Sequence, residues 1–331
     1  MKSIRGSYEN ENGNPVIDVH SHFTTPEYLK MMERHGALLE DGFPLPHWSG
    51  EDHMKLMDTC GINWSYISLS SPQPYFPGDD QEAIEMCRSL NERAAALKET
   101  YPDRFGFGAC LPLPNVSAAV KEAEYALDQL HANGVKLASN SRGLYLGDPA
   151  LEPLMEVLND RKAICNIHPH RPEPIKEGIF SSGPVPLYEF LADTTRAVLN
   201  LISHGVIEKY PEIKWIVPHC GSFLPNIYDR FLGISEILVP QGLMERVDVQ
   251  ENFGRLYFDL SGTPVPHMLD LLLTVAKPDH IMYGADFPFT PAPMVERNLR
   301  ELTQMLSERE DLRAYKDMIL YQNAERLFGL E

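Results

Sequence analysis

The strongest constraint on the fold is an alternation of short strand-like runs with longer helical stretches that repeats eight times. The strand candidates are apolar, rich in β-branched residues and bounded by turn residues, at positions 16–20, 65–69, 105–110, 134–138, 163–168, 213–219, 256–260 and 280–284. Helical periodicity covers 80–100, 117–132, 149–159, 187–210 and 266–276, and closing helices are predicted at 293–306 and 308–328. This order is typical of a closed parallel barrel or a large doubly wound sheet. Because no glycine-rich nucleotide motif follows any strand candidate, the barrel is favoured.

The 331 residues fit one large domain, since barrels of this kind commonly reach roughly 250 residues or more. We expect a polar, flexible stretch at 1–14 and a single barrel domain at 15–331. The segment 23–50 is too long for an ordinary loop after the first strand, and its proline and aromatic residues predict an insertion or lid over the barrel mouth. The segment 169–186 is similar in composition.

Composition limits the partners. A net charge of -18 opposes binding to nucleic acid and to anionic membrane surfaces, because both require basic patches. No stretch approaches the ~20 apolar residues of a membrane span, so a cytoplasmic location is expected. The five cysteines are scattered without a Cys-x-x-Cys pair, which suggests neither a thiolate zinc site nor a disulfide framework.

The first strand candidate leads into His20-Ser21-His22. Residues two apart on a strand share one face, so both imidazoles can reach one metal ion. They would fill only half of a tetrahedral shell. Further ligands must come from other parts of the chain.

Other unusual polar residues also fall at the ends of strand candidates: Lys136, His168 and His219, with Asp286 shortly after the eighth. Taken singly, each is compatible with an ordinary structural role. Functional residues of parallel barrels come from the carboxyl ends of the strands, so their shared position predicts a metal site there. His170, two residues beyond His168, is a further candidate for contact with a substrate.

Four segments carry a resemblance to a known family, the amidohydrolase superfamily and, within it, the aminocarboxymuconate-semialdehyde decarboxylase-like branch. They match the branch in type and order over nearly the whole chain: Asp18-Val19-His20-Ser21-His22-Phe23, His168-Pro169, Val217-Pro218-His219-Cys220-Gly221 and Tyr283-Gly284-Ala285-Asp286-Phe287-Pro288. The resemblance implies a distorted (β/α)8 barrel with a small insertion after the first strand.

The resemblance also implies the site. One divalent metal ion, most often zinc with manganese or cobalt as alternatives, would be held by His20, His22, His168 and Asp286. His219 would be the catalytic acid or base beside the metal-bound water. Three neutral imidazoles and one carboxylate leave the ion a net positive charge, which suits catalysis.

The chain departs from the aromatic decarboxylases of this branch that act on dihydroxybenzoates. Those often have Glu in place of the first His and a second Glu three residues after the catalytic His, whereas this chain has His20 and Ser222. The resemblance therefore points toward the semialdehyde-type or methylsalicylate-type decarboxylases.

The expected activity is non-oxidative decarboxylation of a small unsaturated or aromatic carboxylic acid. Arg171 is the first candidate to hold the substrate carboxylate, and Trp48 and Phe289 are candidates to line an apolar, planar pocket. The resemblance also suggests a homodimer.

Three alternatives stay open. Lys136, as a carbamate, could bridge a second metal ion bound by His168 and His219 in a binuclear hydrolase. A hydratase could use the same metal-bound water. A non-enzymatic barrel with a structural ion is disfavoured, because structural zinc sites usually contain cysteine.

Overall fold

The computed structural model describes residues 15–175 and 184–330 and contains eight parallel strands surrounded by helices. The strand order is β1-β2-β3-β4-β7-β8-β9-β10, so consecutive strands of the barrel are neighbours. Their bounds are Val16–His22, Ile62–Ser68, Phe105–Ala109, Gly134–Ala138, Ile164–His168, Lys214–Val217, Tyr257–Asp259 and Ile281–Met282. A small antiparallel hairpin of β5 (Asn140–Ser141) and β6 (Leu144–Tyr145) follows β4. The expected flexible stretch 1–14 lies outside the described residues.

The barrel closes between β1 and the chain after β10 without a regular ladder. Val19 N donates to Tyr283 O at 3.0 Å, His22 N donates to Phe287 O at 2.7 Å, and Ser21 forms an isolated parallel bridge with Phe287. The short β10 therefore leaves part of the seam to loop backbone, which distorts the barrel. The predicted distorted (β/α)8 barrel is confirmed.

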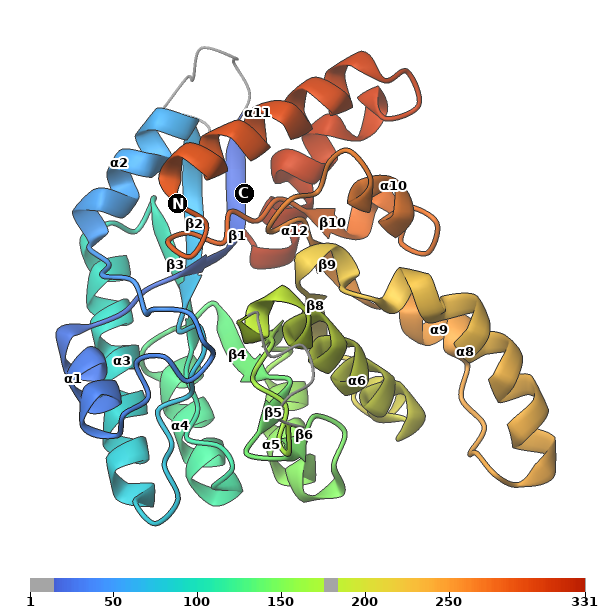
Figure 1. Cartoon of the computed structure of the whole chain (residues 1–331), viewed down its shortest axis with the longest axis horizontal. Coiled ribbons are helices and arrows are strands. Elements are labelled where there is room, and N and C mark those ends of the chain that lie inside the picture. The colour runs from blue at the N-terminus through green and yellow to red at the C-terminus, as the bar shows by residue number, and fades with distance from the viewer. Residues whose placement is uncertain (1–14, 176–183, 331) are drawn as a thin grey trace.

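Helices cover the outside of the barrel (Figure 1), and α8 and α9 reach away from its body. Their bounds are α1 Pro26–Arg34, α2 Gly50–Cys60, α3 Asp80–Thr100, α4 Val116–Asp128, α5 Glu152–Asp160, α6 Glu189–Ser203, α7 Val206–Lys209, α8 Leu224–Leu238, α9 Val249–Gly254, α10 Met268–Leu272, α11 Ala292–Glu308 and α12 Asn323–Phe328. Single 3₁₀ turns occupy Pro149–Leu151, Val185–Leu187, His219–Gly221, Val239–Gln241, Pro278–His280 and Arg313–Tyr315, and a π turn occupies Met318–Gln322. No helix in the described ranges is long and apolar enough to cross a membrane.

Most predicted elements are present, and three differ. The predicted helix 187–210 is divided into α6 and α7, because Gly205 adopts a left-handed conformation at φ 64° and starts a new helix. The predicted helix 308–328 begins later, and its helical part from Arg313 to Phe328 combines 3₁₀, π and α turns. The chain is extended at Arg309, then forms the 3₁₀ and π turns before α12. The eighth strand is shorter than 280–284, because the backbone N–H of Tyr283 donates to Ile319 instead of joining the ladder.

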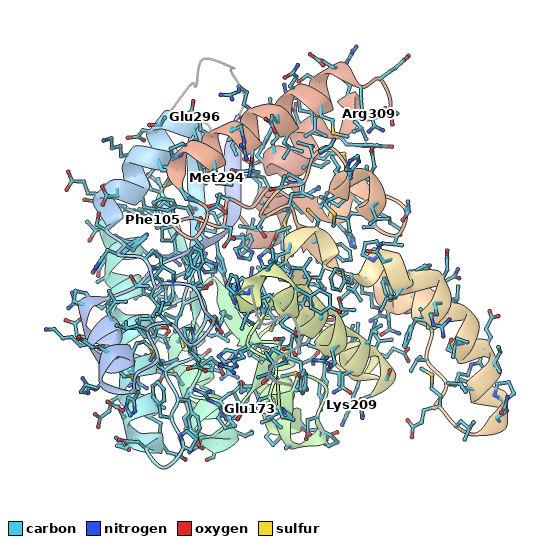
Figure 2. The ribbon with its side chains drawn as sticks, in the orientation of Figure 1. Phe105, Glu173, Lys209, Met294, Glu296 and Arg309 are labelled. Carbon is cyan, nitrogen blue, oxygen red and sulfur yellow. The ribbon has the colours of Figure 1, made fainter. Side chains whose placement is uncertain are left out.

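Local sequence explains the helix boundaries and the close packing. Asp79 and Ser49 accept hydrogen bonds from the first turns of α3 and α2, and Gly61 ends α2 at φ 69°. Side chains fill the space between strands and helices, whereas Glu296 and Arg309 lie at the periphery (Figure 2). The largest fully buried side chains include the rings of Trp64 and Trp215.

The segment 23–50 contains α1 and an irregular stretch that meets the chain before α6. Val185 N donates to Asp41 O at 2.9 Å, and Gly42, at φ +70°, brings its backbone close to Pro184. These contacts join segment 23–50 to the described end of segment 169–186 at the barrel mouth. Both segments have a similar composition.

His53 on α2 is a buried histidine inside a hydrogen-bond chain. Trp48 Nε1 donates to His53 Nδ1 at 3.1 Å, His53 Nε2 lies 3.1 Å from Ser65 Oγ, and Ser65 Oγ donates to Asp18 Oδ2 at 2.7 Å. Burial lowers the pKa of His53 to about 3. The imidazole is therefore neutral in the folded protein at neutral pH.

This burial predicts acid-sensitive stability. An unfolded histidine binds a proton near pH 6.5 and folded His53 only near pH 3, so between these values the unfolded state binds more protons and stability falls as pH falls. His53→Gln has no such group, so its free energy of unfolding should not decrease for this reason as the pH falls. The difference in the free energy of unfolding between wild type and variant should therefore shrink by about 1.4 kcal/mol per pH unit below pH ~6. Urea unfolding at several pH values measures it. The exposed His204→Gln is the control, and an equal change in both variants would contradict the assignment.

Candidate functional site

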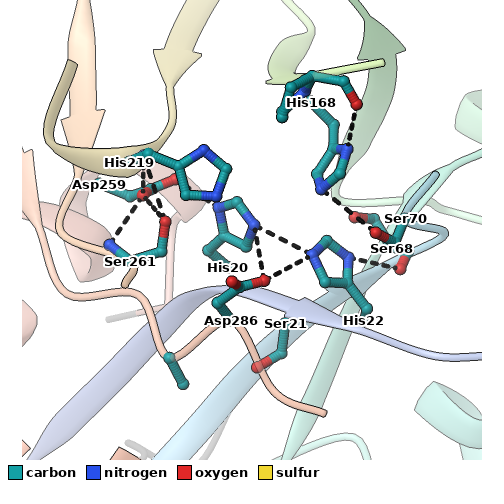
Figure 3. Close-up of polar contacts among 12 residues, drawn as sticks. His20, Ser21, His22, Ser68, Ser70, His168, His219, Asp259, Ser261 and Asp286 are labelled. Atoms are coloured by element: carbon teal, nitrogen blue, oxygen red, sulfur yellow. Dashed lines mark hydrogen bonds and ion pairs between the residues drawn. The ribbon is translucent and has the colours of Figure 1, made fainter. Parts of the chain in front are cut away.

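Five of the predicted site residues meet at the carboxyl ends of the strands (Figure 3). His20 and His22 lie on β1, His168 ends β7, His219 follows β8 and Asp286 follows β10. Ligand atoms of His20, His22 and His168 lie within 4.8 Å of one another, and so do those of His20, His219 and Asp286. The structure therefore brings together residues that are up to 266 positions apart in the sequence, from residue 20 to residue 286.

The tautomers of three imidazoles follow from their partners. In each, Nδ1 faces an oxygen that can only accept a hydrogen bond, so Nδ1 carries a hydrogen and Nε2 is the atom that can bind a metal ion or a further proton. The three bonds run from His20 to Asp259 Oδ2 (2.8 Å), from His22 to Ser68 O (3.2 Å) and from His168 to Pro169 O (2.8 Å). This is the arrangement in which histidines bind metal ions.

These Nε2 atoms converge with a carboxylate oxygen. His20 Nε2 lies 3.1 Å from His22 Nε2, and Asp286 Oδ1 lies 3.2 Å from His22 Nε2 and 3.6 Å from His20 Nε2. Acceptors this close repel one another unless a positive charge lies among them. The donor set thus fits a divalent cation with nitrogen and oxygen ligands.

The electrostatics of the cluster agree with this. Burial lowers the pKa values of His22 and His168, which keeps both imidazoles neutral. Burial also acts against protonation of His20, but the charge of Asp259 outweighs it and raises the pKa of His20 to about 9. The site therefore attracts positive charge, and a metal ion would compete with a proton for it.

A buried carboxylate fixes the backbone on both sides of the cluster. Asp18 Oδ1 accepts hydrogen bonds from His20 N at 3.0 Å and from Ala285 N at 2.9 Å. Gly284 lets the two chains approach, because a Cβ atom there would lie 2.8 Å from His20 Cβ. Asp18 thus fixes the backbone of His20 relative to that of Ala285, the residue before Asp286.

An irregular register in β1 aims the histidines inward. Asp18 pairs with Ser65 and Ser21 with Ile67, so three steps on β1 match two on β2. Such a bulge redirects side chains at the end of a strand.

His219 sits in a strained turn beside the cluster. Its φ is 56°, and Asp286 has φ 58°, in the left-handed region that costs energy for residues other than glycine. The backbone N–H of His219 donates to Asp259 Oδ1 at 3.1 Å. Its Nδ1 is buried and has no hydrogen-bond partner among the described residues. Burial lowers its pKa to about 4, so the ring is neutral at neutral pH.

A cavity of about 350 Å³ opens onto this cluster. Phe289 lines it, as expected from the sequence, and its ring packs edge-on against His22 with centroids 5.5 Å apart. The surface of the cavity is mainly apolar, and its other lining residues are Asp41, Phe43, Leu45, Ser70, Ser71, His168, Pro186, Phe190, Leu191, His219, Cys220, Ser261, Gly262, Thr263, Met268 and Asp286. A planar, mainly apolar molecule would fit here.

Two predicted substrate contacts lie elsewhere. Arg171 Nη1 donates to Glu40 O at 3.1 Å, and Trp48 packs against Phe23 while its indole N–H bonds to His53. Neither residue lines this cavity. Both come from loops whose course the sequence pattern does not specify.

Lys136 and His170 are buried beside the site. Lys136 Nζ donates to Ser70 O at 3.0 Å, and burial lowers its pKa. His170 Nε2 accepts a hydrogen bond from Gln73 N at 3.2 Å. Both side chains therefore support the loop after β2, and neither lines the cavity.

Sequence reasoning missed Asp259, which orients His20 and anchors His219. Its Oδ1 also accepts from Ser261 Oγ at 2.6 Å. Burial opposes ionisation, but the charge of His20 outweighs it and lowers the pKa of Asp259 to about 2. A signal existed, since Asp259 is a carboxylate at the end of the predicted strand 256–260.

Comparisons with known proteins match nearly the whole chain. The family model described as amidohydrolase covers residues 17–330. A 6-methylsalicylic acid decarboxylase of Penicillium expansum is 32% identical over 286 residues, which are 85% of this chain and 87% of the relative.

Solved structures are similar over the same span. One described as an amidohydrolase II has a TM-score of 0.87 and 37% identity, covering 95% of this chain and 99% of that chain. A 5-carboxyvanillate decarboxylase of Novosphingobium aromaticivorans, determined with manganese and a nitrobenzoic acid, has a TM-score of 0.85 at 22% identity, with 96% and 97% covered. At that identity the likeness shows the fold alone.

Asp259 gives a direct test of the metal centre. Asp259→Asn removes the charge that polarises His20, so affinity for Zn²⁺ or Mn²⁺ should fall about 10- to 100-fold while the fold is kept. Competition with a chromophoric chelator measures the affinity. Asp270→Asn, which removes an exposed carboxylate paired with Arg309, is the matched control. Unchanged affinity in Asp259→Asn would contradict the role of this carboxylate.

Proposed function

Because this chain belongs to the amidohydrolase family, we propose that it is a metal-dependent decarboxylase of a small aromatic carboxylic acid. One observation carries the proposal: three imidazole lone pairs and a carboxylate oxygen converge at the end of a mainly apolar cavity. The reaction named for the Penicillium relative supports the same reaction class.

The Nε2 atoms of His20, His22 and His168 and the Oδ1 atom of Asp286 would hold one divalent ion. When bound, the ion supplies positive charge for the carboxylate and hydroxyl oxygens of the substrate. Zinc and manganese both suit this donor set, and the manganese of the carboxyvanillate decarboxylase keeps manganese beside zinc as a candidate.

His219 is proposed to move the proton. As a neutral imidazole with an unpartnered Nδ1, it can take the proton of a substrate hydroxyl and return it to the ring carbon that bears the carboxylate. The new C–H bond forms, the bond to the carboxylate carbon breaks with its electrons returning to the ring, and CO₂ leaves.

The aromatic lining would orient the ring for this transfer. Phe43 and Phe289 lie with ring centroids 6.2 Å apart, and Phe190 lies with its centroid 6.2 Å from that of His168. Apolar walls exclude water and strengthen the electrostatic contacts at the metal end.

The binuclear hydrolase and the hydratase remain predictions that no observation favours. The Nζ atom of Lys136 donates to the Ser70 carbonyl, and Lys136 does not line the cavity. The homodimer and the cytoplasmic location also stay predictions.

Replacing His219 separates catalysis from metal binding. His219→Asn should lower kcat for CO₂ release by about 10²- to 10⁴-fold while metal content stays at the wild-type value. Elemental analysis and a CO₂ assay on the same preparations measure both. Exposed His204→Asn is the control. Loss of metal together with turnover would instead favour the two-ion arrangement.

Metal removal tests the cofactor. Dialysis against a chelator should abolish CO₂ release from 2-hydroxybenzoates, and one equivalent of Zn²⁺ or Mn²⁺ per chain should restore it. A parallel screen of muconate-type acids covers the semialdehyde alternative. Two ions per chain, a carbamylated Lys136 and no CO₂ would move the proposal to a hydrolase.

A further inference from the structure

The mechanism above leaves one acidic residue of the cavity unused. Asp41, in the irregular part of segment 23–50, lines the cavity and is only 5% exposed. Its Oδ2 accepts a hydrogen bond from Ser71 Oγ at 2.7 Å. Its Oδ1 is buried and has no hydrogen-bond partner in the part of the chain that the structure describes.

The backbone holds this carboxylate in place. The carbonyl of Glu40, just before it, accepts from Arg171 Nη1, and the carbonyl of Asp41 itself accepts from Val185 N. The unpartnered oxygen therefore belongs to a cavity-lining residue whose backbone is fixed by hydrogen bonds. Buried acceptors in native proteins nearly always have a partner, so a missing one points to a ligand that donates.

The protonation state of Asp41 suits a hydrogen-bond acceptor. Burial raises the pKa of Asp41 to about 6, with Glu40 acting in the same direction and Ser71, Arg171 and Lys136 acting against it. The carboxyl group is therefore mainly ionised at neutral pH.

Asp41 is connected to the metal-binding cluster through two consecutive residues of one loop, Ser70 and Ser71. Ser71 donates to Asp41, while Ser70 Oγ lies 3.4 Å from His168 Nε2. Neighbouring Cα atoms are about 3.8 Å apart, so the carboxylate is within on the order of 10 Å of the cluster. That span suits one substituted benzene ring.

Resting on the proposed function, we propose that Asp41 forms a specificity subsite that accepts a hydrogen bond from a hydroxyl group on the ring edge away from the metal. The preferred substrate is then a monocarboxylic aromatic acid with such a hydroxyl. A second carboxylate at that edge would face an anion, and none of the described residues that line the cavity is an Arg or Lys.

The test compares wild type with Asp41→Asn, which keeps the shape and the bond from Ser71 but offers the ligand an NH₂ group. Values of kcat/KM for CO₂ release are measured for 2,3-, 2,4- and 2,5-dihydroxybenzoate and for 2-hydroxybenzoate. Wild type should prefer at least one dihydroxy acid, and Asp41→Asn should reduce that preference roughly tenfold or more. The intrinsic reactivity of each acid is the same for both proteins. A change between the proteins in the ratio of kcat/KM values for two acids therefore reports the contact with residue 41.

Glu40→Gln is the matched control, since it removes the neighbouring carboxylate, which pairs with Arg142 at 2.8 Å and does not line the cavity. It should keep the wild-type preference. Asp41→Ala is a second variant that must lose the preference too, should Asp41→Asn fold poorly. A preference unchanged in the Asp41 variants, or lost equally in Glu40→Gln, would overturn the inference.

A binding measurement separates this inference from the proposed reaction. Calorimetry compares catechol, resorcinol and hydroquinone with phenol on metal-loaded wild type and Asp41→Asn. If no acid releases CO₂ but a dihydroxybenzene binds more tightly than phenol only when Asp41 is present, the subsite stands and the decarboxylase proposal fails. If wild type does not distinguish these phenols and no acid is preferred, the subsite is absent.

Discussion

The Nε2 atoms of His20 and His22 and the Oδ1 atom of Asp286 lie 3.1 to 3.6 Å apart, and ligand atoms of His20, His22 and His168 lie within 4.8 Å of one another. Such a set is repulsive unless a proton or a metal ion lies within it, so the surrounding protein must hold it in place. Asp259 fixes His20, backbone carbonyls fix His22 and His168, and Asp18 fixes the backbone on which His20 lies. The site is therefore preorganised for a cation by groups that do not touch the ion.

The bonds that close the barrel are the bonds that assemble this cluster. The seam between β1 and the chain after β10 includes the bond from Asp286 N to His20 O at 2.6 Å and the bond from Ala285 N to Asp18 Oδ1. A regular ladder here would leave no room for the turn in which Asp286 adopts a positive φ. The distortion of the barrel and the placement of the carboxylate ligand thus have one structural cause.

The fold and the metal cluster could be predicted because both depend on patterns that are local in sequence. Apolar runs identify the strands, and a parallel barrel brings all their carboxyl ends to one face, which is why His168 and Asp286 could be grouped with His20. Asp259 also lies at the end of a predicted strand, so its position near the cluster was predictable, but its contact with His20 across 239 positions is not specified by a local pattern. Positions in loops are not specified by such a pattern, and neither Arg171 nor Trp48 lines the cavity.

With the proposed ion bound at the cluster, two parts of the cavity would differ in charge. The cluster of His20, His22, His168 and Asp286 attracts a cation, and a bound ion would hold an anionic substrate group there, whereas Asp41 presents an anion to the other edge. Between them the walls are mainly apolar, so both ends act in a medium that screens charge poorly. A molecule with an acidic group at one edge and a hydrogen-bond donor at the other satisfies both ends at once, and the reversed orientation satisfies neither. In the proposed reaction, the orientation of the ring before proton transfer would therefore follow from the charge arrangement of the cavity, without an Arg or Lys among its described lining residues.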